Sequence, residues 1–85
     1  MDDEVLTLLA DVMQALWRSN AEWPNKPCSL ARLSKQAGRP MSVLRRQLTM
    51  LEEARLVDVA LDEGGVSGTV AFTPAGRQMA MEIFG

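Results

Sequence analysis

The first third of the chain carries apolar residues at the spacing of one helix. Placed at about 100° per residue, those within residues 3–18 cover an arc of about 180°, and polar residues fill the opposite side. The apolar positions are Val5, Leu6, Leu8, Leu9, Val12, Met13, Leu16 and Trp17. A surface helix needs an apolar stripe only roughly 100° wide. The pattern therefore predicts a helix over 3–18 that packs against its own core and against a second surface.

Two shorter helices are predicted in the middle of the chain, after a loop that contains Pro24 and Pro27. These prolines prevent the first helix from continuing. The second helix is predicted over 29–37, with Ser29 as its N-cap and a glycine directly after its end. The third is predicted over 40–54, because apolar residues recur along it at steps of three and four. These residues are Met41, Leu44, Leu48 and Leu51.

The period of the pattern changes after residue 55. Two runs with β-branched residues, 56–61 and 69–73, indicate antiparallel strands, because a turn-forming stretch rich in glycine separates them. A last helix is predicted over 74–84, with Thr73 as its N-cap and a proline in its first turn. The whole chain, 1–85, is thus expected to form a single domain that is mainly α with a small β-hairpin, an α+β fold.

Charged residues are unevenly distributed, although the net charge is only −2. Residues 25–50 contain six basic residues and no acidic one. The flanking segments, 1–24 and 51–85, each carry a net charge of −4. A local basic surface is typical of a protein that binds a polyanion. The sequence therefore favours a polyanionic partner for the middle of an otherwise acidic chain.

Composition narrows the chemistry that the chain is expected to perform. It contains no histidine and no tyrosine, and Cys28 is its only cysteine. We therefore expect no Cys/His metal site, no imidazole catalysis and no cofactor, and a protein that is not an enzyme. No apolar run approaches the roughly 18 residues of a membrane span, and the chain begins with acidic residues rather than a signal peptide. A cytoplasmic protein without membrane contact is expected.

Two stretches resemble winged helix-turn-helix domains. Residues 33–57, Leu-Ser-Lys-Gln-Ala-Gly-Arg-Pro-Met-Ser-Val-Leu-Arg-Arg-Gln-Leu-Thr-Met-Leu-Glu-Glu-Ala-Arg-Leu-Val, are similar to the second helix, turn and recognition helix of MarR- and ArsR-type bacterial transcriptional regulators. Residues 72–76, Phe-Thr-Pro-Ala-Gly, are similar to the start of the helix that follows the β-hairpin, or wing, of these regulators. The resemblance implies a winged helix-turn-helix fold without pointing to one subfamily.

The resemblance also implies a set of functional residues. In such proteins the recognition helix lies in the major groove of double-stranded DNA, and its N-terminal part reaches the base edges. Carried over by position, the base-facing residues are Ser42, Val43, Arg45, Arg46 and Thr49. The residues placed for phosphate contacts are Arg32, Lys35 and Arg39. Arginine is the most frequent bidentate reader of guanine, which favours Arg45 and Arg46 as base contacts.

The sequence departs from the pattern of these regulators in three places, of which one is Ser34, early in the second helix, where an alanine is usual. Arg55 stands where a small glycine usually precedes the Leu-Val of the recognition helix end. The wing, 57–73, has no Lys or Arg but carries Asp58, Asp62 and Glu63, whereas a wing that grips DNA usually presents a basic tip. Two functions stay open. One is a sequence-specific DNA-binding transcriptional regulator that holds DNA mainly with its second and third helices. The other is a winged-helix module for protein–protein contact without DNA binding.

Surplus apolar residues predict a homodimer, which would match palindromic DNA sites. On the last helix, Met79, Ala80 and Ile83 are expected to face the core, and the two remaining large apolar residues to point elsewhere. The predicted interface consists of Leu6, Leu9, Met13, Met81 and Phe84. The chain has neither the metal ligands of an ArsR-type sensor nor the long flanking helices that enclose a MarR-type effector pocket, so neither function is expected.

Overall fold

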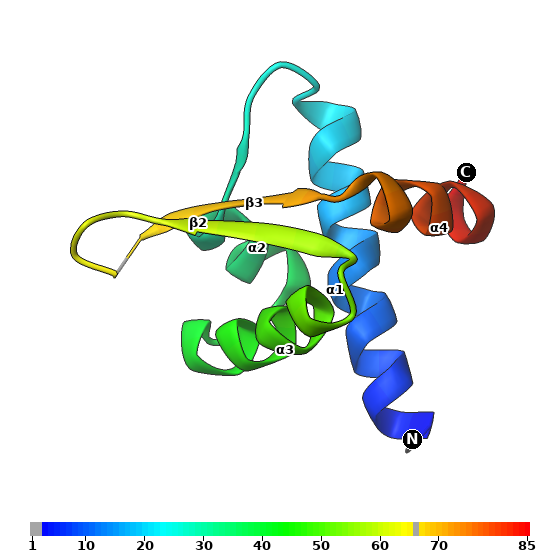
Figure 1. Cartoon of the computed structure of the whole chain (residues 1–85), viewed down its shortest axis with the longest axis horizontal. Helices are drawn as coiled ribbons and strands as arrows, with labels where there is room; N and C mark the ends of the chain where they lie inside the picture. Colours follow the sequence, from blue (N-terminus) through cyan, green and yellow to red (C-terminus); the bar gives the residue numbers. More distant parts are fainter. Residues whose placement is uncertain (1–2, 66) are drawn as a thin grey trace.

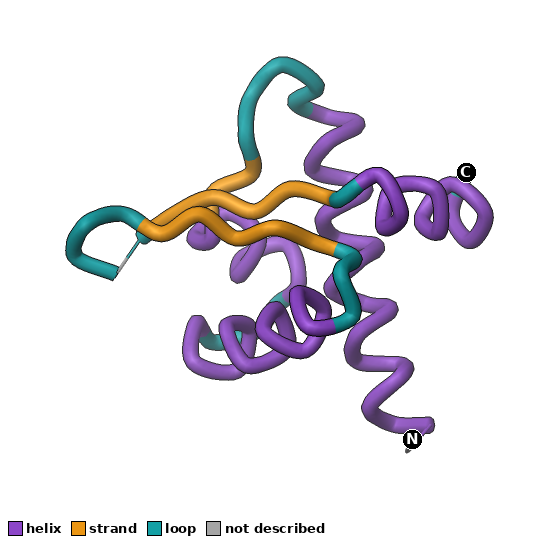
Figure 2. Tube along the Cα trace, viewed as in Figure 1, coloured by secondary structure: helices purple, strands orange, loops and turns teal. Residues whose placement is uncertain are grey.

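The computed structural model describes residues 3–65 and 67–85, which form helices around one three-stranded sheet (Figure 1). The elements are α1 Asp3–Glu22, β1 Cys28–Ser29, α2 Leu30–Ala37, α3 Met41–Glu53, β2 Val57–Leu61, β3 Gly68–Phe72 and α4 Pro74–Phe84. The sheet is antiparallel with the order β1-β3-β2, and β2 and β3 form the projecting wing (Figure 2). Val66, in the turn predicted between these strands, lies outside the described residues.

This is the winged helix-turn-helix arrangement that the sequence predicts. The helices α2, α3 and α4 and the strands β2 and β3 begin and end within one residue of their predicted bounds. These segments carry clear local signals, namely capping residues, glycine-rich turns and a regular apolar period. The mainly α fold with a small β-hairpin is therefore confirmed.

The first helix is longer than predicted, because α1 ends at Glu22 and not at residue 18. The polar stretch after Arg18 suggests a loop, yet Ser19 occupies a helical position that is buried in the core. The helical hydrogen bonding continues past the end of α1, where the N–H of Trp23 donates to the carbonyl oxygen of Ser19 at 2.9 Å. Pro24 follows directly and ends the helix. Tertiary packing thus outweighs the local polar signal.

A third strand, β1, is absent from the sequence prediction. Its two residues pair with the wing strand β3, Cys28 opposite Val70 and Ser29 opposite Thr69. A strand of two residues is too short to show an alternating pattern, so no local signal could have revealed it. The pairing places β3 in the middle of the sheet and leads the chain directly into α2.

The core forms around α1, which packs against α2, α3, α4 and β1. The buried apolar side chains are Val12, Met13, Ala15, Leu16, Cys28, Leu30, Leu33, Leu44, Leu48, Leu51, Val57, Val70 and Ala80. Each fully buried Leu or Val contributes about 1.5–3 kcal/mol relative to an exposed one. The central position of α1 means that its apolar face fixes the other helices relative to one another.

The turn between α2 and α3 is held by local hydrogen bonds. The Ser29 hydroxyl accepts from the N–H of Arg32 at 3.1 Å and caps the start of α2. Gly38 ends this helix in the left-handed conformation, with φ +66°. Beyond it, the N–H of Arg39 donates to the Ser34 carbonyl at 3.1 Å, and the Ser34 hydroxyl donates to the Arg39 carbonyl. These bonds set the direction in which α3 leaves the turn.

A second fixed point joins the end of α3 to the start of α4. The Thr73 hydroxyl donates to the Arg55 carbonyl at 2.6 Å and accepts from the N–H of Gly76 at 3.0 Å. The Thr73 N–H donates to the Leu56 carbonyl at 3.1 Å. A Cβ on Gly76 would overlap the Leu56 carbonyl oxygen and lie 2.7 Å from its carbonyl carbon. The Thr-Pro-Ala-Gly motif therefore lets two backbone segments touch where a side chain would separate them.

Arg55 adopts the left-handed conformation, with φ +62°, immediately after α3. This explains why a glycine is usual at this position, because glycine reaches φ > 0 without the steric penalty of a Cβ. The side chain of Arg55 is exposed, so the strain comes from its backbone and not from packing. The departure from the family pattern therefore lowers stability without changing the path of the chain.

We predict that Gly76→Ala destabilises the fold by about 2–3 kcal/mol or more, since the added methyl forces two backbone segments apart. Urea unfolding followed by circular dichroism measures the change. Ala75→Ser, at the exposed neighbouring position, serves as the control and should leave the free energy of unfolding nearly unchanged. An unaltered unfolding midpoint for Gly76→Ala would contradict the close contact.

We predict that Arg55→Gly stabilises the protein by about 0.5–1 kcal/mol, because it removes the left-handed strain at a modest cost in chain entropy. Arg55→Ala is the matched control, since alanine keeps the Cβ and removes only the exposed remainder of the side chain. Its unfolding midpoint should equal that of the unsubstituted protein. Equal midpoints for the glycine and alanine variants would show that the strain is absent.

Candidate nucleic-acid interface

The outer face of α3 carries the five residues that the sequence assigns to base contacts. Ser42, Val43, Arg45, Arg46 and Thr49 are all exposed, while Leu44, Leu48 and Leu51 on the opposite face are buried. The steps of three and four between the buried leucines bring these two sets to opposite sides of one helix. The structure thus brings the predicted base-facing residues together on one accessible helix face.

The two arginines of this face are free of carboxylate partners. Within the described residues, neither Arg45 nor Arg46 forms an ion pair. The Thr49 hydroxyl donates to the Arg45 carbonyl at 2.9 Å, so it already has a partner inside the helix and presents mainly its methyl group. Two uncompensated guanidinium groups on an exposed helix are suited to bind an anion or a base edge.

The wing is attached to α3 through a carboxylate. Glu52, near the end of α3, accepts a hydrogen bond from the N–H of Val59 on β2 at 3.4 Å. A small cavity of about 60 Å³ lies between the two elements, lined among others by Arg45, Glu52 and Leu61. The start of α3 and the tip of the wing lie on the same side of the molecule (Figure 1). The start of α3 and the tip of the wing therefore border one side of the molecular surface (Figure 1).

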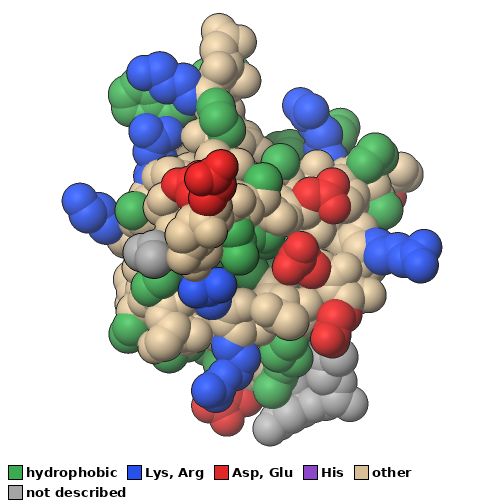
Figure 3. Space-filling view, turned by 60° about the vertical axis from the view of Figure 1, so that its left-hand side comes forward, with side chains coloured by type: hydrophobic (Ala, Val, Ile, Leu, Met, Phe, Trp, Pro, Cys, Tyr) green, Lys and Arg blue, Asp and Glu red, His purple; other side chains and the backbone are tan. Residues whose placement is uncertain are grey.

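That side of the molecule is not uniformly positive. Figure 3 turns it toward the viewer and shows red carboxylates beside the blue basic side chains. Asp58, Asp62 and Glu63 of the wing are exposed. At the tip, the Ser67 hydroxyl donates to the Asp62 carboxylate, and the N–H of Gly65 donates to the Asp62 carbonyl at 2.8 Å. The turn is thus closed by an acidic residue, as its sequence predicts.

The three cations assigned to phosphates differ in their surroundings. Lys35 is exposed on α2. Arg39 forms an ion pair with Asp11 of α1 at 3.2 Å, and only 13% of its side chain is exposed. Arg32 is partly buried, and its guanidinium carbon lies 5.0 Å from the centroid of the Trp23 ring. Lys35 and Arg32 are therefore available to an anion, whereas Arg39 already holds a carboxylate.

Sequence reasoning missed two features of this surface. Asp11 and Arg39 lie 28 positions apart, and no local pattern connects them. The ring of Trp23 also contacts Lys26, whose ammonium lies 5.5 Å from the ring centroid. An aromatic residue beside Lys26 in a short loop with two prolines was the available signal, but it does not specify a contact by itself.

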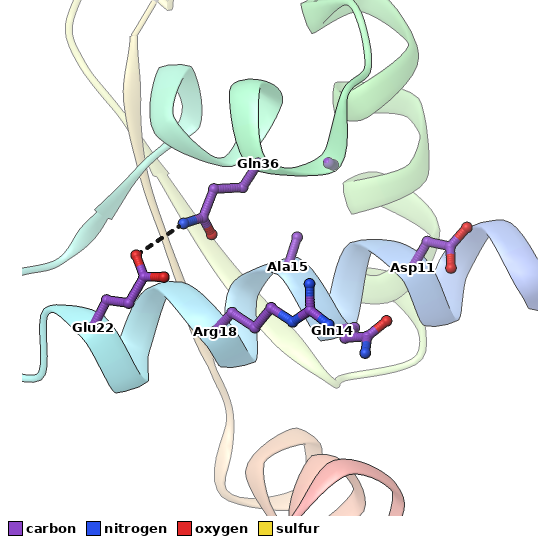
Figure 4. Close-up of a pocket in the computed structure, with 7 residues that line it drawn as sticks. Asp11, Gln14, Ala15, Arg18, Glu22 and Gln36 are labelled. Atoms are coloured by element: carbon purple, nitrogen blue, oxygen red, sulfur yellow. Dashed lines mark hydrogen bonds between the residues drawn. The ribbon is translucent and has the colours of Figure 1, made fainter.

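A polar pocket of about 340 Å³ opens between α1 and α2. Its lining residues are Asp11, Gln14, Ala15, Arg18, Glu22, Gln36 and Ala37. Figure 4 shows Arg18 lying along α1 beside Gln14, while the Gln36 amide donates to the Glu22 carboxylate at 3.3 Å. Across the described residues, no three acidic or cysteine side chains converge as a metal site. No helix in the described part of the chain is long and apolar enough to span a membrane.

Large apolar side chains are exposed on α1 and α4, the two helices to which the sequence assigns a dimer interface. Leu6 is 49% exposed, Met81 57% and Ile83 58%. Leu9 and Phe84 are half-buried against the core. Met13, which was assigned to the dimer interface, is only 4% exposed within the single chain. It therefore has almost no surface left to contribute to a partner.

The prediction for the inner face of α4 was right for one residue of three. Ala80 is buried, but Met79 and Ile83 are exposed. The inner row consists of Gly76, Ala80 and the half-buried Phe84, at steps of four. This row faces the core, and the neighbouring apolar residues Met79, Met81 and Ile83 are exposed. Met79 and Ile83 extend the apolar surface beyond the residues that the sequence assigned.

Comparison with known proteins places this geometry in a family. Residues 10–60 match the model of a family described as the helix-turn-helix domain. A crystal structure of a candidate DNA-binding protein from Ralstonia eutropha JMP134 is similar, with 35% identity and a TM-score of 0.82, over 93% of this chain and 96% of that one. A search of functionally curated proteins found no match.

Two further solved structures share the fold. A MarR-family transcriptional regulator from Silicibacter pomeroyi has 27% identity and a TM-score of 0.67, covering 95% of this chain but 55% of that regulator. A protein from Archaeoglobus fulgidus has 20% identity and a TM-score of 0.70, over 89% of this chain and 78% of that one. With the family match and the wing both in place, the chain belongs to the helix-turn-helix domain family, in the winged form that MarR-type regulators share.

Proposed function

We propose that this protein is a double-stranded DNA-binding transcriptional regulator that acts as a homodimer and reads sequence with α3 in the major groove. The observation that carries the proposal is the exposed face of α3, where Arg45 and Arg46 are free of ion pairs. The relative from Ralstonia eutropha, described as a candidate DNA-binding protein, and the MarR-family regulator support the same function. The acid-free segment 25–50 supplies the positive charge that DNA attracts.

In this proposal each residue on the exposed face of α3 makes a different kind of contact with DNA. Arg45 and Arg46 read guanine through bidentate hydrogen bonds, and Ser42 binds a phosphate or a base edge. The methyl groups of Val43 and Thr49 contact thymine methyls, since the Thr49 hydroxyl already donates within the helix. Sequence specificity then resides in one short stretch of α3.

Phosphate binding is assigned mainly to α2 in the proposed complex. Lys35 and Arg32 contact the backbone directly. Arg39 contributes indirectly, because its ion pair with Asp11 ties the turn before α3 to α1. The wing stays at a distance from the phosphates, since Asp58, Asp62 and Glu63 are exposed and acidic. The DNA is therefore held by the two helices rather than gripped by the wing.

The proposed dimer uses the exposed apolar side chains of α1 and α4. Leu6, Met81 and Ile83 form its centre, while Leu9 and Phe84 contribute their exposed parts. A two-fold interface places two recognition helices on half-sites about one DNA turn apart. Burial of these side chains between two copies removes exposed apolar surface of the two helices from water.

A second function is favoured by two observations. The wing carries only acidic charge and the α1–α4 surface is apolar, which suits contact with another protein as well as with a second copy. A winged-helix module of this kind would bind a partner protein and show no saturable binding to duplex DNA. The DNA measurement below separates the two functions.

We expect Arg45→Ala/Arg46→Ala to weaken binding to random-sequence duplex DNA at least tenfold, because two cations leave the DNA surface. Fluorescence anisotropy across a salt series measures it. For the unsubstituted protein, log Kobs should fall against log salt with a slope of about −0.9 per phosphate contacted.

Arg18→Ala/Arg77→Ala is the matched control, since it removes the same charge from exposed positions on α1 and α4. This variant should bind nearly as the unsubstituted protein does. A flat salt response, or equal losses in the two double variants, would refute α3 as the DNA surface. Absence of any binding at low salt would favour the protein-contact function.

We expect Leu6→Glu and Met81→Glu to convert a dimer into a monomer in sedimentation velocity, because each places a charge in the apolar interface. Both positions are strongly exposed in the single chain, so the fold should persist. Leu61→Glu, at an equally exposed apolar position on β2, should leave the mass unchanged. An unaltered mass in all three variants would exclude this interface.

A further inference from the structure

Three side chains outside α3 form a compact cationic group, here called the Trp23 cluster. It consists of Trp23 and Lys26 in the loop after α1 and Arg32 in the first turn of α2. The Lys26 ammonium lies 5.5 Å from the centroid of the indole ring, and the Arg32 guanidinium carbon lies 5.0 Å from it. Trp23 is 45% exposed, so the ring is a surface feature and not a core residue. Both distances lie within the range of cation–π attraction.

The charge of the Trp23 cluster is not compensated by any acid. Within residues 3–65 and 67–85, neither Lys26 nor Arg32 forms an ion pair with a carboxylate, whereas Arg39 pairs with Asp11. One Arg32 terminal nitrogen, Nη1, is buried and has no hydrogen-bond acceptor. Both cations contact the same ring and carry like charge, so a bound anion would offset their mutual repulsion. The cluster therefore presents two cations on one exposed ring, and neither forms an ion pair with a carboxylate among the described residues.

The indole ring links the loop to α2 and limits the freedom of both cations. The Arg32 main chain is fixed, because its N–H donates to the Ser29 hydroxyl at 3.1 Å. Lys26 is fixed less firmly, by a hydrogen bond from its N–H to the Trp23 carbonyl at 3.2 Å. Lys and Arg side chains otherwise lose much rotamer freedom when they bind a ligand. Holding them on a ring beforehand lowers that loss.

We infer that Trp23 is a positioning residue that holds Lys26 and Arg32 ready for one backbone phosphate of DNA. The inference rests on the proposed function and adds two residues to it, Trp23 and Lys26. A phosphate fits because its oxygens accept from a guanidinium and an ammonium together. Arg39 is the contrast within the same chain, since its partner is the Asp11 carboxylate instead of an aromatic ring.

The test compares Trp23→Leu with Trp23→Phe by anisotropy on the same duplex. Leucine removes the aromatic face, and we expect a two- to fivefold weaker affinity, the range of an exposed cation–π contact. Phenylalanine keeps a ring and should restore most of the loss. Thermal unfolding of both variants checks that the fold persists. Equal affinity of Trp23→Leu and the unsubstituted protein would overturn the inference.

A double-mutant cycle separates positioning from a merely structural role. If Trp23 acts through the two cations, Trp23→Leu should have no further effect in a Lys26→Ala/Arg32→Ala background. The same loss in that background would overturn the inference. Lys26→Ala alone should reduce the magnitude of the salt slope by about 0.9, and an unchanged slope would exclude Lys26 from phosphate contact.

The same experiments distinguish a failure of this inference from a failure of the proposed DNA-binding function. Binding that depends on Arg45 and Arg46 but not on Trp23 overturns only the inference about the cluster. Absence of salt-sensitive binding in the unsubstituted protein overturns both. A loss in Trp23→Leu that Trp23→Phe restores supports both.

Discussion

The contact between Gly76 and the backbone of Leu56 is the constraint on which the arrangement of this domain depends. There the end of α3, the base of the wing and the start of α4 meet, and no Cβ fits between them. Thr73 adds a hydroxyl that bonds to Arg55 on one side and to Gly76 on the other. The direction of the recognition helix and that of α4 are thus set at one point. The helix proposed to read DNA and a helix of the proposed dimer interface are therefore fixed relative to each other.

Local signals explain why so much of the fold could be predicted from the sequence. Ser29, Gly38 and Thr73 each form the cap that their residue type favours, and the leucines of α3 are buried at the expected period. The missed features depend on contacts between distant segments. The last turn of α1 carries Ser19 into the core, and β1 forms by pairing with the distant strand β3.

The candidate site likewise contains features that the sequence predicts and features that depend on contacts between distant segments. Helical spacing predicts an exposed face on α3, and the five residues that the family resemblance assigns to base contacts are all exposed. The state of the phosphate-contact candidates does not follow from sequence, because Arg39 and Arg32 look alike in a basic segment. One is paired with Asp11 and the other rests on Trp23. The wide apolar arc of the first helix likewise led to the assignment of Met13 to the dimer interface. Packing of α1 against the other helices buries this residue instead.

The bond between Glu52 and the N–H of Val59 has a consequence for how copies of the protein associate. β2 is an outer strand of the sheet, and an outer strand with free N–H groups is a template for strand addition and aggregation. The carboxylate of α3 occupies the N–H at the middle of that strand and brings a negative charge to the edge. At the opposite edge, β1 offers only two residues. Association through sheet extension is therefore disfavoured on both sides, and the helices are left as the surfaces through which this protein can meet a second copy.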